Sequence, residues 1–597
     1  QHVLRLQPDA TALDQVVVTA TRTPKALKDA PVVTRLITAN DIKIADATNI
    51  QDLLTEQMPG LEFGYAMNQE TSLNMNGFGG NAVLFLVDGE RLAGETMDNV
   101  DYSRLNLDNV GRIEIVKGAA SALYGASAVA GVINIISREN SEPWTANVNT
   151  RYNDFNKEWR HGGSFSFNAG KWNSQTSIQR TTSDEVQLTS PFDTESNILH
   201  IYGGETFNVK ERLTYKLSDK IKLIGRGGYF NRISKRSNYD DHYMDYSAGL
   251  KTVMNLSEND NLEISYGFDQ YDKTRFVNNE RTHDHDYTNR QNIVRALYSH
   301  IFGKNTLTAG ADFLNDYLTT YQFANNGSKT QNSYDAFAQF DYNPLQWLNI
   351  VASLRHDYFS ASSQHATTGR LALMTKWKGF SIRANYAGGF RAPTLKEMYM
   401  NFDMAGMQMI YGNPDLKPEK SNNYNLALEH TGRVKNAGFF TGQYSLTLMG
   451  YYNKYDKRIT TEDYADYTPG TGQPDVASRY CNEDGVEVSG IDFSAQYRSD
   501  MGLGVKLDYS YLHVGGRSVD SQFSQPRPHS ATWRFDYDRQ LCSFYRINAA
   551  LSGRYLSSPD TNIKKHDSSY QLWKFTLQQR FLDAVNLNFT VDNLFGY

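Results

Sequence analysis

The chain has 597 residues and is mildly acidic, with 60 Lys and Arg against 66 Asp and Glu and a formal net charge of −6. It contains no basic block that would neutralise phosphates, so nucleic-acid binding is not favoured. It also contains no run of about 18 apolar residues, so it predicts no transmembrane helix. Cys481 and Cys542 lie far apart in sequence, which leaves a disulfide open but favours two unrelated cysteines.

The first 30 residues read as an N-terminal tail with one β-prone run. Valine and threonine are frequent in strands because their branched side chains pack well on a pleated surface. A short strand at this position would have a backbone edge that is free to pair. The run consists of Val16, Val17, Val18, Thr19 and Thr21.

Two helices are expected next. After a strand that starts near Val32, Asn40 or Asp41 is expected to start a helix. A second helix places Ile50, Leu53, Leu54 and Met58 on one face, and Pro59-Gly60 ends it.

Three buried strands follow. Residues 83–87 form an apolar run that ends in an Asp88-Gly89 turn, and residues 113–116 and 132–136 form two more. A segment rich in Gly, Ala and Ser joins the last two and allows close backbone packing.

Two of these segments resemble the plug domain of TonB-dependent outer-membrane receptors. Their sequences are VLFLVDGERL and RIEIVKGAASALYGASAVAGVINI. The resemblance implies a plug over residues 31–140. Two plug loops, residues 64–73 and 92–105, would rise towards the outside and contact the ligand. The chain departs from the family pattern at Met75-Asn76-Gly77, Lys117 and Ala119, which leaves individual plug contacts undetermined. The ligand-contacting residues expected in the plug loops are Tyr65, Met67, Asn68, Glu95 and Met97.

The resemblance also gives the N-terminal run a role. Val16, Val17, Val18 and Thr19 are similar to the TonB box, which pairs as an added strand with the periplasmic energy-coupling protein TonB. The alternative is an ordinary first strand.

From residue 141 the pattern changes to period two. Trp144, Ala146, Val148 and Tyr152 alternate with polar residues, as expected for strands with one face in lipid and one in a polar lumen. Such strands are compatible with the mean hydropathy of −0.57. The sequence therefore predicts an all-β transmembrane protein, in which residues 141–597 form an antiparallel outer-membrane barrel occluded by an N-terminal α+β plug. The family would supply roughly 22 strands, and in relatives a segment like residues 593–595 (NLF) is followed by one more strand. Either a further strand follows Tyr597, which we favour, or the barrel closes unusually.

One barrel loop carries two recognisable motifs. Residues 390–393 (FRAP) and 413–416 (NPDL) resemble motifs of haem receptors, which also occur in cobalamin and some siderophore receptors. They would either contact the ligand or only shape the loop. A haem receptor would place an axial histidine between them, and this chain has none there. Flexible, polarisable methionines would instead offer an adaptable surface to a large macrocycle. The expected contacts are Met404, Met407 and Met409.

Acidic residues in two neighbouring loops are similar in placement to calcium sites of cobalamin receptors. Calcium takes six to eight oxygen ligands, so two acidic loops are chemically reasonable. The alternative is solvated surface carboxylates. His283 and His285 are a weaker candidate for a transition-metal site. The candidate calcium ligands are Asp193, Glu195, Asp240, Asp241 and Asp245.

The resemblance implies TonB-dependent import of a large, scarce ligand, with cobalamin first, haem second and a ferric siderophore third. An enzyme is not expected, since no Gly-x-Ser-x-Gly elbow is present, and a plugged lumen argues against a passive porin. No covalent cofactor is expected. The expected partners are TonB, outer-membrane lipid and lipopolysaccharide, and a ligand-capturing surface lipoprotein.

Overall fold

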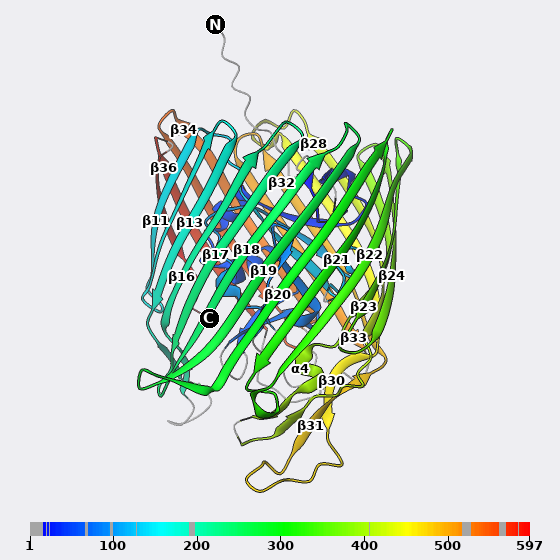
Figure 1. Cartoon of the computed structure of the whole chain (residues 1–597). Helices are drawn as coiled ribbons and strands as arrows, with labels where there is room; N and C mark the ends of the chain where they lie inside the picture. Colours follow the sequence, from blue (N-terminus) through cyan, green and yellow to red (C-terminus); the bar gives the residue numbers. More distant parts are fainter. Residues whose placement is uncertain are drawn as a thin grey trace.

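The computed structural model describes residues 16–596 except residues 20, 23, 66–69, 96–98, 127, 190–197, 405, 516–526, 560–568 and 583. Figure 1 shows a tall cylinder of tilted strands with a smaller α+β unit inside it. We call the inner unit the plug and the cylinder the barrel. Among the described residues, no helix is long and apolar enough to cross a membrane.

The plug is built on a five-stranded sheet with the strand order β3-β9-β10-β7-β8. Strand β10 runs antiparallel to β9 and parallel to β7, so the predicted strands around residues 83–87, 113–116 and 132–136 are neighbours. The plug elements are β1 (Val16–Val17), β2 (Lys25–Ala26), β3 (Thr34–Thr38), α1 (Ala39–Ala45), α2 (Ile50–Gln57), β4 (Leu61–Tyr65), β5 (Thr71–Met75), β6 (Phe78–Gly79), β7 (Val83–Val87), β8 (Glu90–Arg91), β9 (Val110–Lys117), α3 (Ser121–Tyr124) and β10 (Gly131–Ser137).

Local sequence explains the turn and the helix starts. Asp88 and Gly89 have φ values of 52° and 83°, the positive values that a two-residue type I′ hairpin requires, which confirms the predicted turn. Helix α1 starts slightly earlier than predicted because Thr38 caps it. The Thr38 hydroxyl accepts from the Asp41 N–H, and the Asp41 carboxylate accepts from the Thr38 N–H.

The barrel is a 21-stranded sheet among the described residues, and consecutive strands of this sheet pair antiparallel, as the fold prediction requires. Its strands are β11 (Trp144–Asn153), β12 (Glu158–Ala169), β13 (Trp172–Ser183), β16 (Gly204–Lys216), β17 (Ile221–Lys235), β18 (Asp240–Asn255), β19 (Asp260–Val277), β20 (Glu280–Phe302), β21 (Asn305–Thr320), β22 (Ser328–Leu345), β23 (Leu348–Phe359), β24 (Gln364–Trp377), β25 (Phe380–Arg391), β28 (Glu419–Val434), β29 (Gly442–Asp456), β32 (Val486–Ser499), β33 (Leu503–Gly515), β34 (His529–Cys542), β35 (Tyr545–Leu556), β36 (Tyr570–Phe581) and β37 (Val585–Val591).

The outer face of the barrel is apolar, as the period-two pattern predicts. Ile264, Leu426 and Ile491 are exposed on it, whereas alternate residues such as Asp269 and Asn423 are buried against the lumen. Burying polar side chains inside and exposing apolar ones outside is the arrangement that a lipid environment favours.

The plug is hydrogen-bonded to the first and last strands of the barrel sheet, β11 and β37. Asp46, just after α1, accepts hydrogen bonds from Arg151 of β11 at 3.0 Å and from Asn588 and Thr590 of β37 at 2.9 and 2.6 Å. One plug carboxylate therefore connects the first and last strands of the sheet.

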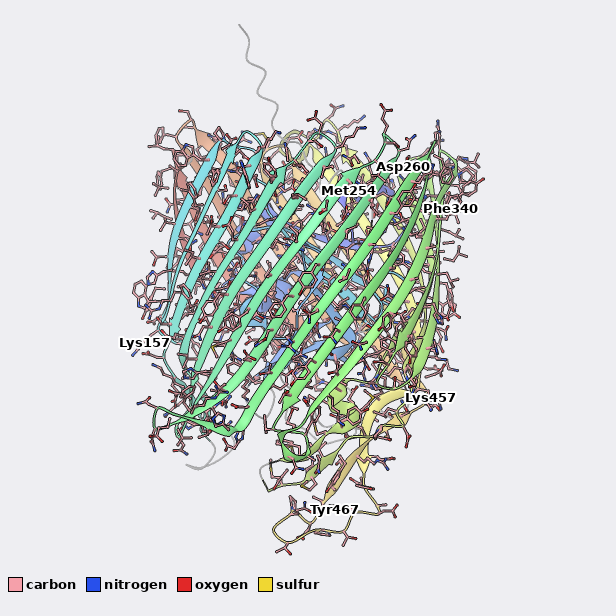
Figure 2. The ribbon with its side chains drawn as sticks, viewed as in Figure 1. Lys157, Met254, Asp260, Phe340, Lys457 and Tyr467 are labelled. Atoms are coloured by element: carbon pink, nitrogen blue, oxygen red, sulfur yellow. The ribbon has the colours of Figure 1, made fainter. Side chains whose placement is uncertain are left out.

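The two ends of the barrel differ. At one end, which we call the turn end, short turns join the strands, and Met254 and Asp260 mark it in Figure 2. The opposite loop end carries Lys457 and Tyr467 and the larger loops. Elements within those loops are β14 (Val186–Thr189), β15 (Ile198–Ile201), α4 (Leu395–Tyr399), β26 (Asn401–Asp403), β27 (Met409–Tyr411), β30 (Arg458–Asp463) and β31 (Ala477–Glu483).

Candidate ligand-binding site

A cavity of about 200 Å³ lies at the loop end between the plug and the barrel wall. Tyr65 at the tip of β4 lies at its edge and is 62% exposed. The plug side is lined by Tyr65, Glu70, Thr71, Val100, Asp101, Tyr102 and Ser103, and the barrel side by His200, Ile201, Tyr202, Arg232, Ser234 and Arg236. The cavity therefore forms where a plug loop expected to contact ligand meets the barrel.

Arg232 joins the two walls of this cavity. Its guanidinium donates to Glu70 at 2.9 Å and to Asp101 at 3.0 Å, both on the plug. It also lies over the Tyr243 ring, 3.8 Å from the centroid, and the Tyr243 hydroxyl donates to Glu70 at 2.9 Å. Short contacts from several directions fix this arginine as a structural link between plug and barrel.

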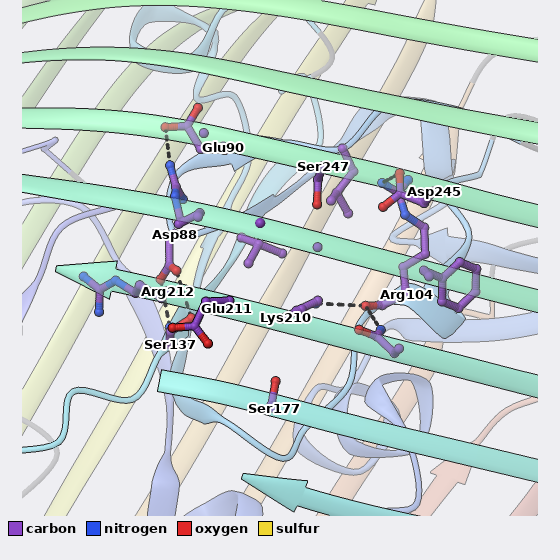
Figure 3. A pocket seen from close by; sticks show the side chains of 18 of the residues that line it. Asp88, Glu90, Arg104, Ser137, Ser177, Lys210, Glu211, Arg212, Asp245 and Ser247 are labelled. Carbon is purple, nitrogen blue, oxygen red and sulfur yellow. Dashed lines mark hydrogen bonds and ion pairs between the residues drawn. The ribbon is translucent and has the colours of Figure 1, made fainter. Parts of the chain in front are cut away.

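A second cavity, of about 160 Å³, lies deeper along the same interface. Figure 3 shows Arg104 of the plug beside Asp245, with Lys210 donating to the Arg104 carbonyl oxygen at 3.0 Å. The Arg104 guanidinium donates to Asp245 at 2.6 Å and to Asp269 at 3.0 Å. Burial alone would lower the pKa of Arg104, but Asp269 and Asp245 raise it above its ordinary value. The plug is thus held to the barrel by buried charge pairs.

Two of the predicted calcium ligands, Asp241 and Asp245, have cationic side chains as partners. Asp245 is paired with Arg104, and Asp241 lies within 3.0 Å of Arg275, 3.4 Å of Arg236 and 3.7 Å of Lys273. Arginine and lysine therefore occupy the positions around these carboxylates that a cation would need. Among the described residues, no group of three or more His, Cys, Asp or Glu side chains is placed to hold a metal. Asp240, His283 and His285 are therefore not part of such a group. Asp193 and Glu195 lie outside the described residues.

The predicted methionine contacts are placed differently from one another. Met407 is 50% exposed at the loop end, and Met404 is half-buried. Met409 is buried, because it lies in β27, which pairs in parallel with β31. Met409 is therefore part of a loop core rather than an open surface. Met67, Asn68 and Met97 lie outside the described residues.

Glu95, another predicted contact, binds the barrel instead. Its carboxylate forms a 2.7 Å ion pair with Lys396 of α4, and its backbone N–H donates to the Tyr287 hydroxyl at 3.3 Å. A ligand that used Glu95 would have to break this link between α4 and the plug.

The FRAP arginine has a structural position. Arg391 is buried and donates to Glu419 at 2.8 and 2.9 Å and to Glu397 at 2.9 Å. Glu419 also accepts from the Ile459 N–H at 2.6 Å. This network joins α4 to β28 and β30, so the loop-shaping interpretation holds for Arg391 in this structure.

The N-terminal run is held inside the plug. Strand β1 pairs with β2, and Val17 is fully buried rather than at a free edge. The Glu114 carboxylate accepts from the Val18 and Thr19 N–H groups at 2.9 and 2.8 Å and from the Thr19 hydroxyl at 2.6 Å. Asn134 donates to the same hydroxyl at 3.1 Å. We call this contact the Glu114 clasp.

Sequence reasoning missed Glu114 and Arg232 as functional candidates. A signal for Glu114 was present, because a carboxylate in the middle of a buried apolar strand must find donors. Arg232 gave no comparable signal, since its partners Glu70 and Asp101 come from a separate part of the chain.

Comparison with known families explains this architecture. The profile described as "TonB dependent receptor-like, beta-barrel" matches residues 145–594, and the profile described as "TonB-dependent Receptor Plug Domain" matches residues 26–132. The chain belongs to the TonB-dependent receptor family. It is an integral β-barrel of the outer membrane, and its family is made of transporters and receptors that work with TonB.

Two relatives are similar to this chain over most of its length. The vitamin B12 transporter BtuB of Photobacterium profundum is 25% identical to this receptor, over 98% of this chain and 92% of that protein. The iron-regulated outer membrane virulence protein of Vibrio cholerae is 24% identical over 85% of this chain and 79% of that protein.

Solved structures show the same fold at low identity. A mutant of the ferric enterobactin receptor PfeA from Pseudomonas aeruginosa has a TM-score of 0.78 at 16% identity, covering 97% of this chain and 94% of that one. The Serratia marcescens hemophore receptor HasR, in complex with its hemophore and heme, has a TM-score of 0.77 at 12% identity, covering 95% and 96%.

Proposed function

We propose that this receptor imports cobalamin or a related corrinoid across the outer membrane. The observation that carries the assignment is the similarity to BtuB along 98% of the chain. Two features are compatible with it: the loop between residues 393 and 413 has no histidine, and Met407 offers an exposed apolar contact. A corrinoid brings its own filled metal coordination sphere and needs a shaped surface rather than a protein ligand.

In this mechanism the loop end faces outside. Ligand settles against Tyr65 and the neighbouring cavity wall, close to Arg232, which already links barrel and plug. Its binding competes with contacts such as Glu95 to Lys396. On the other side of the plug, Val16 to Thr19 leave the Glu114 clasp and pair with TonB as an added strand. Pulling on that strand then rearranges the plug.

The cargo is tested by equilibrium binding of cyanocobalamin and haemin to the purified receptor in detergent. Submicromolar binding of cyanocobalamin and weaker binding of haemin are expected. Tighter binding of haemin would overturn the corrinoid assignment. The N-terminal role is tested separately: deleting residues 16–19 should abolish uptake and leave binding unchanged, whereas retained uptake would exclude this segment as the TonB box.

Haem is the second candidate, and one residue favours it. His200 lines the loop-end cavity, and its Nδ1 is hydrogen-bonded to Glu185. A carboxylate on Nδ1 leaves Nε2 as the nitrogen that can bind a metal. If haem is the cargo, His200→Ala should abolish the Soret shift on haemin binding, while His161→Ala, remote from the cavity lining, should not.

We propose that the apolar outer face of the barrel contacts outer-membrane lipid and lipopolysaccharide.

A ligand-capturing surface lipoprotein would dock on the sheet β26-β27-β31-β30, which projects from the loop end (Figure 1). The complex of HasR with its hemophore supports a protein partner for a receptor of this fold. Deleting residues 464–476 should abolish lipoprotein capture and retain binding of free ligand.

A further inference from the structure

Four cations form one connected group at the loop end. Arg232 and Arg236 line the cavity, and Lys273 and Arg275 lie on β19 and share the carboxylate of Asp241, on β18, with Arg236. They contact only three carboxylates in the described ion pairs: Glu70, Asp101 and Asp241. This connected group therefore has more cations than carboxylates.

The imbalance is concentrated around Asp241. Arg236, Lys273 and Arg275 all lie within 4 Å of this one carboxylate, at 3.4, 3.7 and 3.0 Å. The Asp241 side chain is only 1% exposed, so screening by water is reduced and the like charges repel one another more strongly. An added anion would lower the energy of this group.

Among the described residues, aromatic rings also contact these cations. The Arg275 guanidinium lies 3.8 Å from the centroid of the Tyr239 ring, and that of Arg236 lies 4.8 Å from the Tyr202 ring. Ring faces attract a cation without neutralising it. The positive charge therefore remains available to a ligand.

Arg232 and Arg236 differ in how they are held. Arg232 has contacts of 2.9 and 3.0 Å to two carboxylates, whereas the contacts of Arg236 are longer, 3.5 Å to Glu70 and 3.4 Å to Asp241. Charged hydrogen bonds are normally 2.7–2.9 Å, roughly, between nitrogen and oxygen. The contacts of Arg236 to Glu70 and Asp241 are therefore ion pairs longer than charged hydrogen bonds, and Arg236 itself lines the cavity that a ligand would enter.

We propose that Arg236, backed by Lys273 and Arg275, binds an anionic group of the transported ligand in the loop-end cavity. The group is a phosphate or carboxylate oxygen, since a guanidinium fork matches both. The inference rests on the proposed import function for the identity of the cargo. A corrinoid would supply its nucleotide-loop phosphodiester, and haem would supply its propionates.

The experiment uses purified full-length receptor and matched ligand pairs that differ in the anionic group. Cyanocobalamin is compared with dicyanocobinamide, which lacks the phosphodiester, and haemin with its dimethyl ester. The wild-type receptor should prefer the anion-bearing member of one pair. The variants Arg236→Gln and Arg236→Gln/Arg275→Gln should bind that member roughly 10- to 100-fold more weakly and bind the other member as before. The pair that shows this pattern identifies the source of the anion.

Lys157→Gln provides the matched control. It removes one positive charge from the loop between β11 and β12, outside the cavity lining, and should leave the preference unchanged. Thermal melting of each variant checks folding. If Arg236→Gln/Arg275→Gln folds and keeps the full preference for the anion-bearing ligand, the proposal is wrong.

A cargo-independent measurement separates this proposal from the import assignment. Citrate and inorganic phosphate should raise the melting temperature of the wild-type receptor above that in chloride at equal ionic strength, and Arg236→Gln should remove the difference. This result supports the anion site even if neither cyanocobalamin nor haemin binds. No difference between the anions in the wild-type receptor would overturn it, whatever the cargo.

Discussion

Glu114 in the plug and Asp241 in the barrel are both almost fully buried carboxylates, 0% and 1% exposed, but they bind different kinds of partner. Glu114 holds the peptide N–H groups and hydroxyl of a chain segment through contacts of 2.6–2.9 Å, together with the side chain of Arg112 at 2.8 Å. Asp241 gathers three cationic side chains at 3.0–3.7 Å.

The difference separates two ways of using a buried charge. Backbone N–H groups bind along defined directions, so the Glu114 clasp fits one strand in one position and is lost when that strand leaves. Charge attraction falls slowly with distance, so the cluster around Asp241 can rearrange when another anion arrives. The first arrangement suits release of a segment, and the second suits admission of a ligand.

The largest effect should come from replacing Asp241. Asp241→Asn removes the only carboxylate that Lys273 and Arg275 contact in the described ion pairs and should destabilise the loop end by about 3 kcal/mol. At the same time it should strengthen the binding of citrate, opposite in sign to Arg236→Gln. Melting curves with and without citrate measure both effects. A variant that melts at the wild-type temperature and ignores citrate would contradict this account of the cluster.

The buried carboxylates also show which features could be predicted from the sequence and which could not. The plug strands, the Asp88-Gly89 turn and the alternating barrel strands were predictable because each is encoded in a few consecutive residues. The expected loop around Asp241 and Asp245 was wrong, because both residues lie on one face of β18. Their partners are not local: register puts Asp241 directly opposite Arg275 of β19, and the plug brings Arg104 to Asp245.

The burial of Met409 also depends on a contact that is distant in sequence. Its methionine-rich loop indicated an open apolar surface, but β27 pairs with β31, which follows some 65 residues later, and this buries the side chain. A pairing between two loops on different barrel hairpins leaves no periodic pattern in either. Glu114 is the converse case, because its position within a buried run already indicated that it needs donors.

A smaller effect is expected at the clasp. Glu114→Gln keeps the shape and one acceptor oxygen but removes the charge, and charge-assisted hydrogen bonds are stronger than neutral ones by roughly 1–2 kcal/mol. Hydrogen exchange of the Val18 and Thr19 amides should therefore accelerate about 10-fold, while the β10 amides exchange as in the wild type. If the clasp amides keep their protection, Glu114 is not what holds the segment.

The smallest effect should come from Thr19→Val, which keeps the shape of the side chain and removes only its hydroxyl. The Glu114 bonds to the Val18 and Thr19 N–H groups remain, but Glu114 loses the hydroxyl donor at 2.6 Å and Asn134 loses its acceptor at 3.1 Å. The expected loss is about 1 kcal/mol, or roughly a 5-fold faster exchange of the same two amides. Thr21→Val, which alters a neighbouring buried threonine outside the clasp bonds to Glu114, provides the control. If Thr19→Val accelerated exchange as much as Glu114→Gln, the hydroxyl rather than the backbone would hold the segment, and the contrast between a directional clasp and an adjustable charge cluster would lose its basis.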